Sequence, residues 1–182
     1  PSHPGRVPKP DQMIMYFAGG EGKSAFDELV SGGVQDVLLS YYYLVERSHD
    51  KGLEFLSGLS QKGYRVFLDS GAFSAANSGK VIDVQDFGRF CLDAAGLIHE
   101  FANLDVIGDE KATLKNQKYL EGLGLAPIPV YHFGEPISAL IDIARNYERL
   151  AIGGVARMGN KKSLLRPFLR KCFATLLDNG PA

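Results

Sequence analysis

The stretch VFLDSGAFSA, residues 66–75, runs from an apolar strand-like segment directly into a carboxylate, a hydroxyl and a glycine. An ionised carboxylate at the rim of an apolar wall is costly unless it is paired or hydrogen-bonded. Gly71 allows the chain to turn sharply and another group to approach its backbone. Asp69 therefore has two interpretations. It either caps the following turn through its own side chain or acts as a functional group at the end of a buried strand.

Similar apolar runs, rich in β-branched and aromatic residues, recur along the chain and predict strands. They cover residues 13–19, 36–44, 64–71, 101–108, 126–134 and 149–155. Helical spacing of apolar residues fills the intervals, at residues 24–31, 51–62, 83–97, 110–123, 137–147 and 161–177. Strands that alternate with helices predict an α/β fold with a parallel sheet.

Two α/β architectures compete for this pattern. A doubly wound sheet usually carries G-x-G-x-x-G after its first strand, but here that strand leads into FAGGEGKS, which also lacks the first glycine of a P-loop. A barrel instead spreads polar groups over the ends of many strands. Five strand ends carry them here: Ser40 with residues 41–43, Asp69 with Ser70, Asp105 with Asp109, Tyr131 with His132, and Gly153 with Gly154.

The predicted fold is therefore a (β/α)8 TIM-barrel type with about six βα units in this chain. We predict two regions, an extended proline-rich arm over residues 1–12 and a partial barrel domain over residues 13–182. Six units leave two open sheet edges, which are a liability for a folded protein. We therefore expect an oligomer, or a partner chain that completes the barrel.

The composition is that of a globular protein, with 182 residues, 45% apolar residues, 23% charged residues and a net charge of −1. This balance excludes a strongly basic nucleic-acid binder, so any nucleic-acid contact must come from a local patch. No apolar run is long enough for a membrane span. Cys91 and Cys172 lack metal-ligand spacing and are expected to be reduced thiols of a cytoplasmic protein.

The C-terminal segment, residues 156–182, provides a local basic patch of this kind. Its basic residues are Arg157, Lys161, Lys162, Arg166, Arg170 and Lys171, and its only acid is Asp178. This excess of positive charge beside the end of the last strand favours contact with phosphates. A solvated helix face explains the same pattern equally simply.

The segment NLDVIGD, residues 103–109, repeats the design of the opening stretch. Asp109 precedes a helix and is expected to cap it. Asp105 alternates with Leu104 and Val106, which predicts that its side chain points into a barrel lumen if those two pack outward. Asp105 is therefore a candidate functional residue.

Two further segments carry candidate groups. PVYHFGE, residues 129–135, places His132 at a strand end, where it is either a structural hydrogen-bonding group or a functional one. AIGGV, residues 151–155, places Gly153 and Gly154 where their N–H groups can bind a carbonyl oxygen or a phosphate, or where packing is tight. Carboxylates and an imidazole also suit a divalent metal ion, although no H-x-H or H-E-x-x-H spacing is present.

LDSGAFSA, NLDVIGD, PVYHFGE and AIGGV, in this order, resemble the tRNA-guanine transglycosylase superfamily. The resemblance covers residues 13–155 and is greatest to the short phage and prokaryotic relatives that act on DNA or RNA in 7-deazaguanine modification. It implies a (β/α)8 barrel that exchanges guanine in DNA or tRNA for a 7-deazaguanine base without a cofactor. For a phage protein, the location would be the host cytoplasm.

The resemblance also implies roles for individual residues. Asp69, in the DSG motif with Ser70 and Gly71, is the catalytic residue that handles proton transfer at the base. Asp105 recognises the amino edge of the base, and backbone N–H groups of the glycine pair contact its carbonyl. His132 stands near a glutamine of the better-known enzymes and is expected to contact the base. Tyr41, Tyr42 or Phe73 is expected to stack on it.

The chain departs from this family at two points. The family's nucleophilic aspartate comes from a strand after the glycine pair, whereas Asp178 is the only carboxylate side chain after Val155 and lies in a helical pattern. No nucleophile is therefore assigned, and no zinc site of clustered cysteines is present. Two alternatives stay open: a non-catalytic nucleic-acid-binding subunit of a modification complex, and a metal-dependent barrel hydrolase or lyase that uses Asp69, Asp105 and His132.

Overall fold

The computed structural model describes residues 14–155 and 161–179, so the predicted arm over residues 1–12 lies outside the described residues. The strands are β1 (Phe17–Ala18), β2 (Asp36–Ser40), β3 (Arg65–Asp69), β4 (Glu100–Phe101), β5 (Val130–His132) and β6 (Ala151–Gly153). The helices are α1 (Lys23–Ser31), α2 (Tyr41–Leu44), α3 (His49–Gln61), α4 (Ala72–Asn77), α5 (Val84–Asp93), α6 (Glu110–Gly122), α7 (Ile137–Asn146) and α8 (Lys162–Asn179). The predicted α/β class is confirmed.

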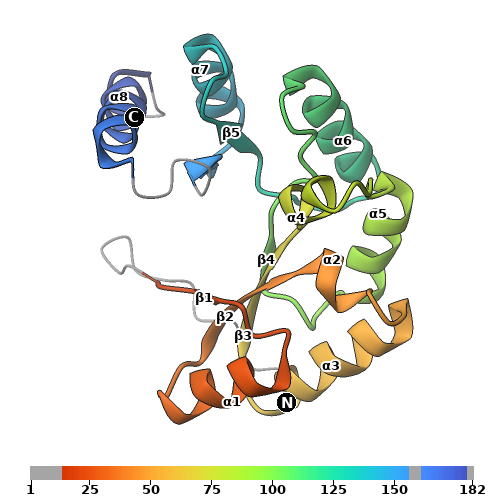
Figure 1. The fold of residues 1–182 in the computed structure, drawn as a ribbon. Helices are drawn as coiled ribbons and strands as arrows, with labels where there is room; N and C mark the ends of the chain where they lie inside the picture. The colour runs from red at the N-terminus through yellow and green to blue at the C-terminus, as the bar shows by residue number, and fades with distance from the viewer. Residues whose placement is uncertain (1–13, 156–160, 180–182) are drawn as a thin grey trace.

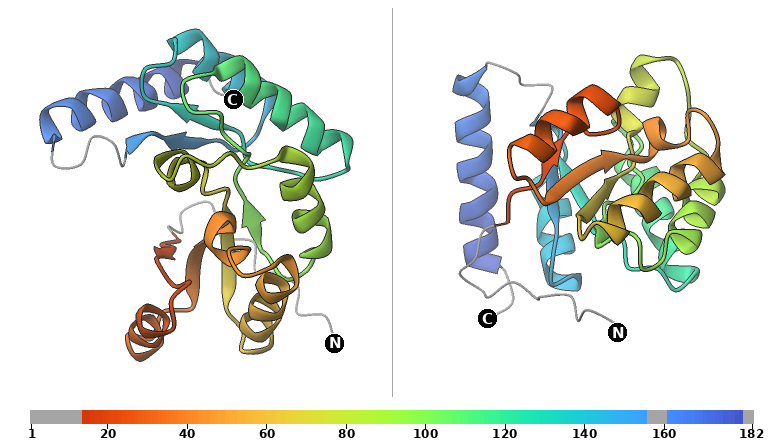
Figure 2. Two further views of the ribbon diagram at one scale, coloured as in Figure 1. Left: turned by 45° about the vertical axis from the view of Figure 1, so that its right-hand side comes forward. Right: turned by 90° about the horizontal axis from the view of Figure 1, so that it is seen from below.

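All strand pairs within the described residues are parallel, and neighbours follow chain order. One sheet has the order β1-β2-β3-β4 and the other pairs β5 with β6. A parallel bridge between Ala102 and Ile128 connects the two sheets. Helices lie on the outer side of the resulting arc of strands, with α1 at one end of the arc and α8 at the other (Figures 1 and 2).

The core explains this layering. Val37 and Leu39 of β2 and Val66 and Leu68 of β3 are completely buried, and they alternate with partly exposed residues. Complete burial of such a side chain stabilises the fold by about 1.5–3 kcal/mol. A second, smaller cluster surrounds Tyr131 and joins β5, α7 and α8. Apolar packing therefore stabilises the strands on both sides of the bridge between Ala102 and Ile128.

Several expected strands are shorter than the apolar runs that predicted them. The run over residues 36–44 forms a strand only to Ser40, because Tyr41–Leu44 turns into α2. The Tyr41 ring is drawn into the core, 5.1 Å from the rings of Phe87 and Phe90. The next strand ends at Asp69, and Gly71, at φ +75°, precedes α4. Helix α2 was missed because its apolar residues read equally well as strand, and α4 was not predicted.

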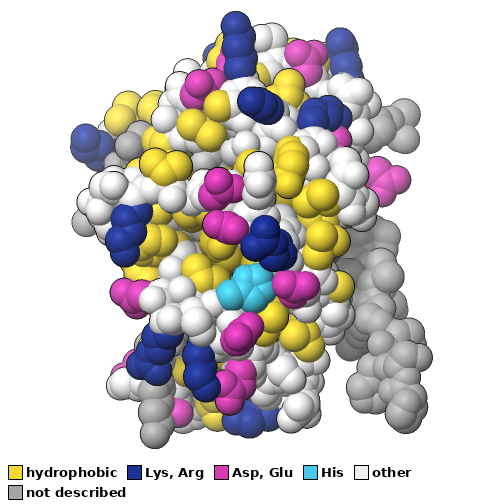
Figure 3. Space-filling model, turned by 90° about the vertical axis from the view of Figure 1, so that its right-hand side faces the viewer, with side chains coloured by type: hydrophobic (Ala, Val, Ile, Leu, Met, Phe, Trp, Pro, Cys, Tyr) yellow, Lys and Arg dark blue, Asp and Glu magenta, His cyan; other side chains and the backbone are white. Residues whose placement is uncertain are grey.

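The described helices include none that combines the length and the apolar character needed to cross a membrane. Both cysteines are buried free thiols, and burial raises the pKa of Cys91 to about 12. On the outer surface formed by the helices, acidic and basic side chains alternate with apolar ones (Figure 3). That face therefore shows no broad patch of a single charge.

Candidate active site

The end of β3 forms a tight turn around Asp69. The Gly71 N–H donates to Asp69 Oδ2 at 2.8 Å, and the Ala72 N–H donates to Ser70 Oγ at 3.3 Å. The capping interpretation of Asp69 is therefore confirmed. It occupies only one carboxylate oxygen, however, and Oδ1 accepts no hydrogen bond from the described residues. Ser70 is 1% exposed, so its hydroxyl serves the turn and does not face solvent.

The environment of Asp69 favours its protonated form. Burial raises the pKa of this carboxyl, and the hydrogen bond from Gly71 offsets the effect only in part. The negative charges of Asp105 and Glu21 raise the pKa further. A raised pKa brings a carboxyl closer to the range in which general acid–base catalysts work.

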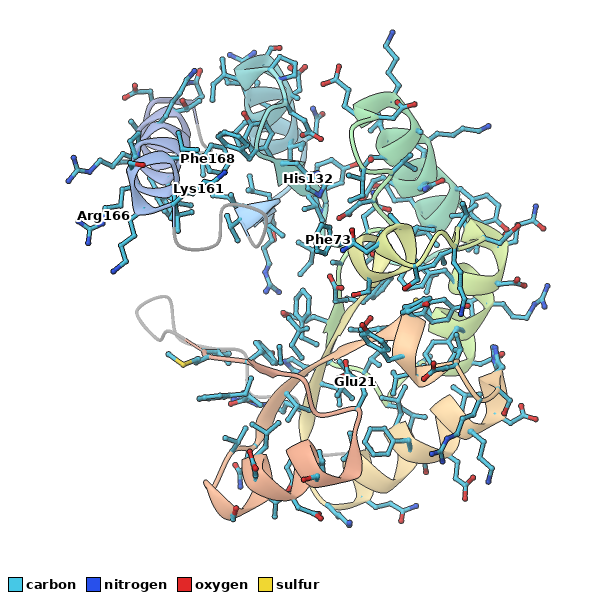
Figure 4. All side chains as sticks on the ribbon, in the orientation of Figure 1. Glu21, Phe73, His132, Lys161, Arg166 and Phe168 are labelled. Carbon is cyan, nitrogen blue, oxygen red and sulfur yellow. The ribbon has the colours of Figure 1, made fainter. Side chains whose placement is uncertain are left out.

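Glu21 was missed in the sequence because its glycine-rich segment reads as a simple turn. It lies in the loop between β1 and α1, and the Ser40 N–H donates to its Oε1 at 2.6 Å. This contact fixes the loop onto the end of β2 (Figure 4). A carboxylate placed between two glycines shortly after a strand was the available signal, since Asp69 also stands near a glycine at the end of a strand.

Gly71 is required by a close approach between β3 and β2. A Cβ atom at Gly71 would lie 2.2 Å from Ser40 Oγ and 2.6 Å from Tyr42 Cβ. Ser40 is 7% exposed and its Oγ has no hydrogen-bond partner among the described residues. An unsatisfied buried hydroxyl costs the fold about 1–3 kcal/mol of stability. The end of β2 therefore contains a polar group that no described residue satisfies.

A second group of charged side chains gathers at the end of β5. His132 Nε2 lies 2.8 Å from Asp105 Oδ2, and His132 Nδ1 lies 3.2 Å from Glu135 Oε1. The His132 backbone N–H also donates to Glu135 Oε2 at 3.0 Å. We call Asp105, His132 and Glu135 the imidazole clamp. Glu135 was not singled out in the sequence, although it lies three residues from His132.

The clamp keeps His132 charged. Burial lowers the pKa of the imidazole, but hydrogen bonds with Asp105 and Glu135 outweigh that effect and raise the pKa to about 9. The ring therefore carries a proton on each nitrogen at neutral pH and donates to both carboxylates. Asp105 Oδ1 stays buried without a partner in the described part of the chain.

Asp105 lies beyond β4, which ends at Phe101, so the expected strand over residues 101–108 is largely absent. The expectation that Leu104 and Val106 pack on the same side was also wrong in part, because Leu104 is buried while Val106 is exposed. Side-chain hydrogen bonds hold this segment instead, including one from Asn116 Nδ2 to the Leu104 carbonyl at 3.0 Å. Asp109 caps α6 as predicted, accepting from the Ala112 N–H at 2.9 Å.

The glycine pair packs against the clamp. A Cβ atom at Gly153 would lie 2.8 Å from His132 Cδ2 and 2.7 Å from Val130 Cγ1. Gly154 has φ +74°, a backbone conformation that side chains disfavour. Tight packing therefore accounts for Gly153, and backbone conformation accounts for Gly154.

The three aromatic candidates differ in accessibility. Tyr41 is 6% exposed and its ring lies in the core, so the expectation that it stacks on a base is wrong for this conformation. The Tyr42 ring lies under the Lys80 ammonium, 5.3 Å from it. Phe73, in the first turn of α4, is 39% exposed and stays a candidate (Figure 4).

No group of three or more histidine, cysteine or carboxylate side chains among residues 14–155 and 161–179 is arranged to hold a metal ion. Both ring nitrogens of His132 already face carboxylates. The donor set proposed for a metal, Asp69 with Asp105 and His132, is thus partly committed to internal hydrogen bonds.

Comparisons of the chain with protein-family models, curated proteins and solved structures gave no match.

Proposed function

We propose that this chain is a transglycosylase-like protein that exchanges guanine for a 7-deazaguanine base in DNA or tRNA. The observation that carries the proposal is the pairing of two carboxyl groups with different properties. Asp69 has a raised pKa and an unbonded oxygen, whereas Asp105 is held by a charged imidazole and keeps a buried acceptor, Oδ1. Neighbouring carboxyl groups with divergent environments are typical of acid–base assignments in enzymes.

In this proposal each group has a defined part. Protonated Asp69 gives its proton to the departing guanine and recovers one from the incoming base. The Asp105 carboxylate accepts an N–H from the amino edge of the base, and the backbone at Gly153 and Gly154 contacts the carbonyl of the base. Phe73 provides an aromatic face for stacking.

The proposed fold is a (β/α)8 barrel, of which this chain supplies six units. Parallel neighbours in strict chain order support it, because a doubly wound sheet reverses its strand order. Within the described residues, β1 and β6 are each paired on one side only. We place the missing strands, and the carboxylate that attacks the sugar, on a partner chain or a second copy. Buried free thiols suit a cytoplasmic setting.

A basic helix supports a polynucleotide substrate. Lys161, Lys162, Arg166, Arg170 and Lys171 are all exposed, and none forms an ion pair with a described carboxylate. Arg166 points away from the rest of the molecule, whereas Phe168 points toward α7 (Figure 4). Arg157, which belongs to the same basic segment, lies outside the described residues.

The same helix favours a second candidate function, a non-catalytic nucleic-acid-binding subunit. Asp178 is exposed near the end of α8 and not at the end of a strand, so no attacking carboxylate is assigned in this chain. Binding of a polynucleotide through α8 needs no such group.

Base exchange distinguishes the two functions. Labelled guanine or 7-deazaguanine is offered to the full chain together with DNA or with tRNA, and incorporation is measured. Incorporation that depends on Asp69 supports the transglycosylase. Salt-sensitive polynucleotide binding with no incorporation and no binding of the free base supports the binding subunit instead.

A further inference from the structure

Glu135 contacts His132 at two points. Its Oε2 accepts from the His132 backbone N–H at 3.0 Å and its Oε1 faces His132 Nδ1 at 3.2 Å. The turn between them is closed by the Glu135 N–H, which donates to the His132 carbonyl at 3.2 Å, and Gly134 takes φ +99° within it. The Tyr131 hydroxyl donates to the Glu135 carbonyl at 2.9 Å. The orientation of the imidazole is therefore fixed by its own turn.

The geometry also fixes the protonation of the ring. A neutral imidazole that donates from Nδ1 to Glu135 would present the lone pair of Nε2 to Asp105 Oδ2, 2.8 Å away. When both carboxylates are ionised, either neutral tautomer places a ring lone pair against a carboxylate oxygen, so the doubly protonated ring is the form that fits this geometry. The side chains of Asp105, His132 and Glu135 are only 14–16% exposed, and water therefore screens these interactions weakly.

The opposite face of the ring is bounded by β6. A Cβ atom at Gly153 would lie 2.9 Å from His132 Nε2. Asp105, Glu135 and Gly153 thus surround the imidazole from three segments of the chain. Asp105 and Glu135 are the ionisable groups that contact it within the described residues.

We infer that Glu135 is a positioning residue: through His132 it holds Asp105 as an acceptor and so selects ligands that present an N–H donor. The ligand class is a nitrogen heterocycle with an amino edge, which would place its N–H donor at the Asp105 carboxylate, whose side chain is 16% exposed. Glu135 itself touches no ligand in this scheme. The assignment of the ligand rests on the proposed function, whereas the link from Glu135 to His132 does not.

The link is tested by titrating the His132 imidazole by NMR in the full chain, comparing the wild type with Glu135→Gln. Glu110→Gln is the matched control, because Glu110 is exposed in the first turn of α6. The wild type and the control are expected to titrate near pH 9, and Glu135→Gln at least one unit lower. A wild-type value near 6.5, or no change in Glu135→Gln, would overturn the positioning role.

The ligand is tested by calorimetric titration with free guanine and with 7-deazaguanine. Glu135→Gln is expected to weaken binding about tenfold, and Glu135→Asp to restore part of it. His132→Gln, whose amide still donates to Asp105, is expected to retain more affinity than His132→Leu. Equal affinity in all four variants would overturn the selection of ligands through Asp105. If no variant and no wild-type sample binds either base, the proposed function fails, while the NMR result still decides the link.

Discussion

The ends of β3 and β5 are built alike but left in opposite electrostatic states. At each end a carboxylate folds back onto a backbone N–H close to it in the chain: Asp69 onto Gly71, and Glu135 onto His132. The β5 end contains a charged imidazole between two carboxylates, whereas Asp69 has two negative neighbours and no cation in contact with it among the described residues. The β5 end therefore holds a positive charge between its carboxylates, whereas at the β3 end burial and negative neighbours raise the pKa of Asp69.

This difference separates a proton-transferring group from a recognition group. A site that exchanges a base needs a carboxyl able to change its protonation, and Asp69 has the unbonded oxygen and the raised pKa for that task. It also needs an acceptor held in a fixed position, which Asp105 provides through its contact with His132 Nε2. The following experiments test or refine this contrast, in order of decreasing expected effect.

The largest effect is expected for Asp69→Asn. The amide keeps the size and can still accept from the Gly71 N–H, but it cannot transfer a proton. Base exchange should fall about 10²–10⁴-fold, while circular dichroism and the unfolding midpoint stay close to the wild type. Asp178→Asn, in the exposed end of α8, is the matched control and should leave exchange unchanged. Full activity in Asp69→Asn would remove the proton-transfer role.

The next effect concerns stability at the β3 end. Gly71→Ala combines a positive φ with a collision against Ser40 Oγ, and overpacking together with backbone strain should cost about 3 kcal/mol or more. Gly63→Ala is the control, because Gly63 has φ +81° and a Cβ atom added there would meet nothing within 4 Å, so about 1 kcal/mol is expected. Urea unfolding of both variants measures the difference. Equal losses would mean that the approach of β3 to β2 is less tight than described.

Substitutions on α8 are expected to have a smaller, salt-dependent effect on oligonucleotide binding. Arg166→Glu with Arg170→Glu should weaken binding of a single-stranded oligonucleotide about tenfold and lower the slope of log affinity against log salt by roughly 1.4. Lys111→Glu with Lys115→Glu changes the same charge at the same spacing on α6 and should have much less effect. Fluorescence anisotropy over a salt series gives both slopes. Similar losses in the two pairs would show that no particular surface is used.

The most gradual effect is a pH dependence of stability, since one titrating group changes the free energy of unfolding by at most about 1.4 kcal/mol per pH unit. The pKa of His132 is raised from 6.5 to about 9 on folding, so its contribution is fully present below pH 6.5 and is lost as the pH rises through 9. The free energy of unfolding should therefore fall across this window in the wild type, and His132→Gln should flatten the decline. Urea unfolding at pH 6, 7.5 and 9.5 measures it. Parallel curves for the two proteins would show that the clamp does not stabilise the fold.

The positions of the strands were easier to predict than the polar contacts between their ends. The apolar runs located the strands and the cap at Asp109, because burial and helix capping act over a few neighbouring residues. The runs overestimated strand length at residues 36–44 and 101–108, where an aromatic side chain and a side-chain hydrogen-bond network redirect the backbone. Apolar character alone does not reveal such tertiary competition.

The candidate residues were found as separate groups and the structure relates them. Asp105 and His132 are 27 residues apart in the chain, and nothing local shows that one imidazole bonds to both Asp105 and Glu135. Glu21 and Glu135 were missed because each stands in a turn with glycine beside it, where a polar residue is ordinary. Their roles depend on tertiary contacts, since Glu21 accepts from the Ser40 N–H and Glu135 contacts His132.

The central claim is tested most directly by calorimetric titration of free 7-deazaguanine into the full chain, the Asp105→Asn variant and the Asp178→Asn control. Binding of a free base needs neither an attacking carboxylate nor additional strands that supply one. We expect the wild type and the control to bind alike and Asp105→Asn to bind at least tenfold more weakly, because the clamped acceptor is replaced by an amide. The absence of binding in the wild type, or equal binding in all three, would contradict the assignment of the strand ends as a base-binding site.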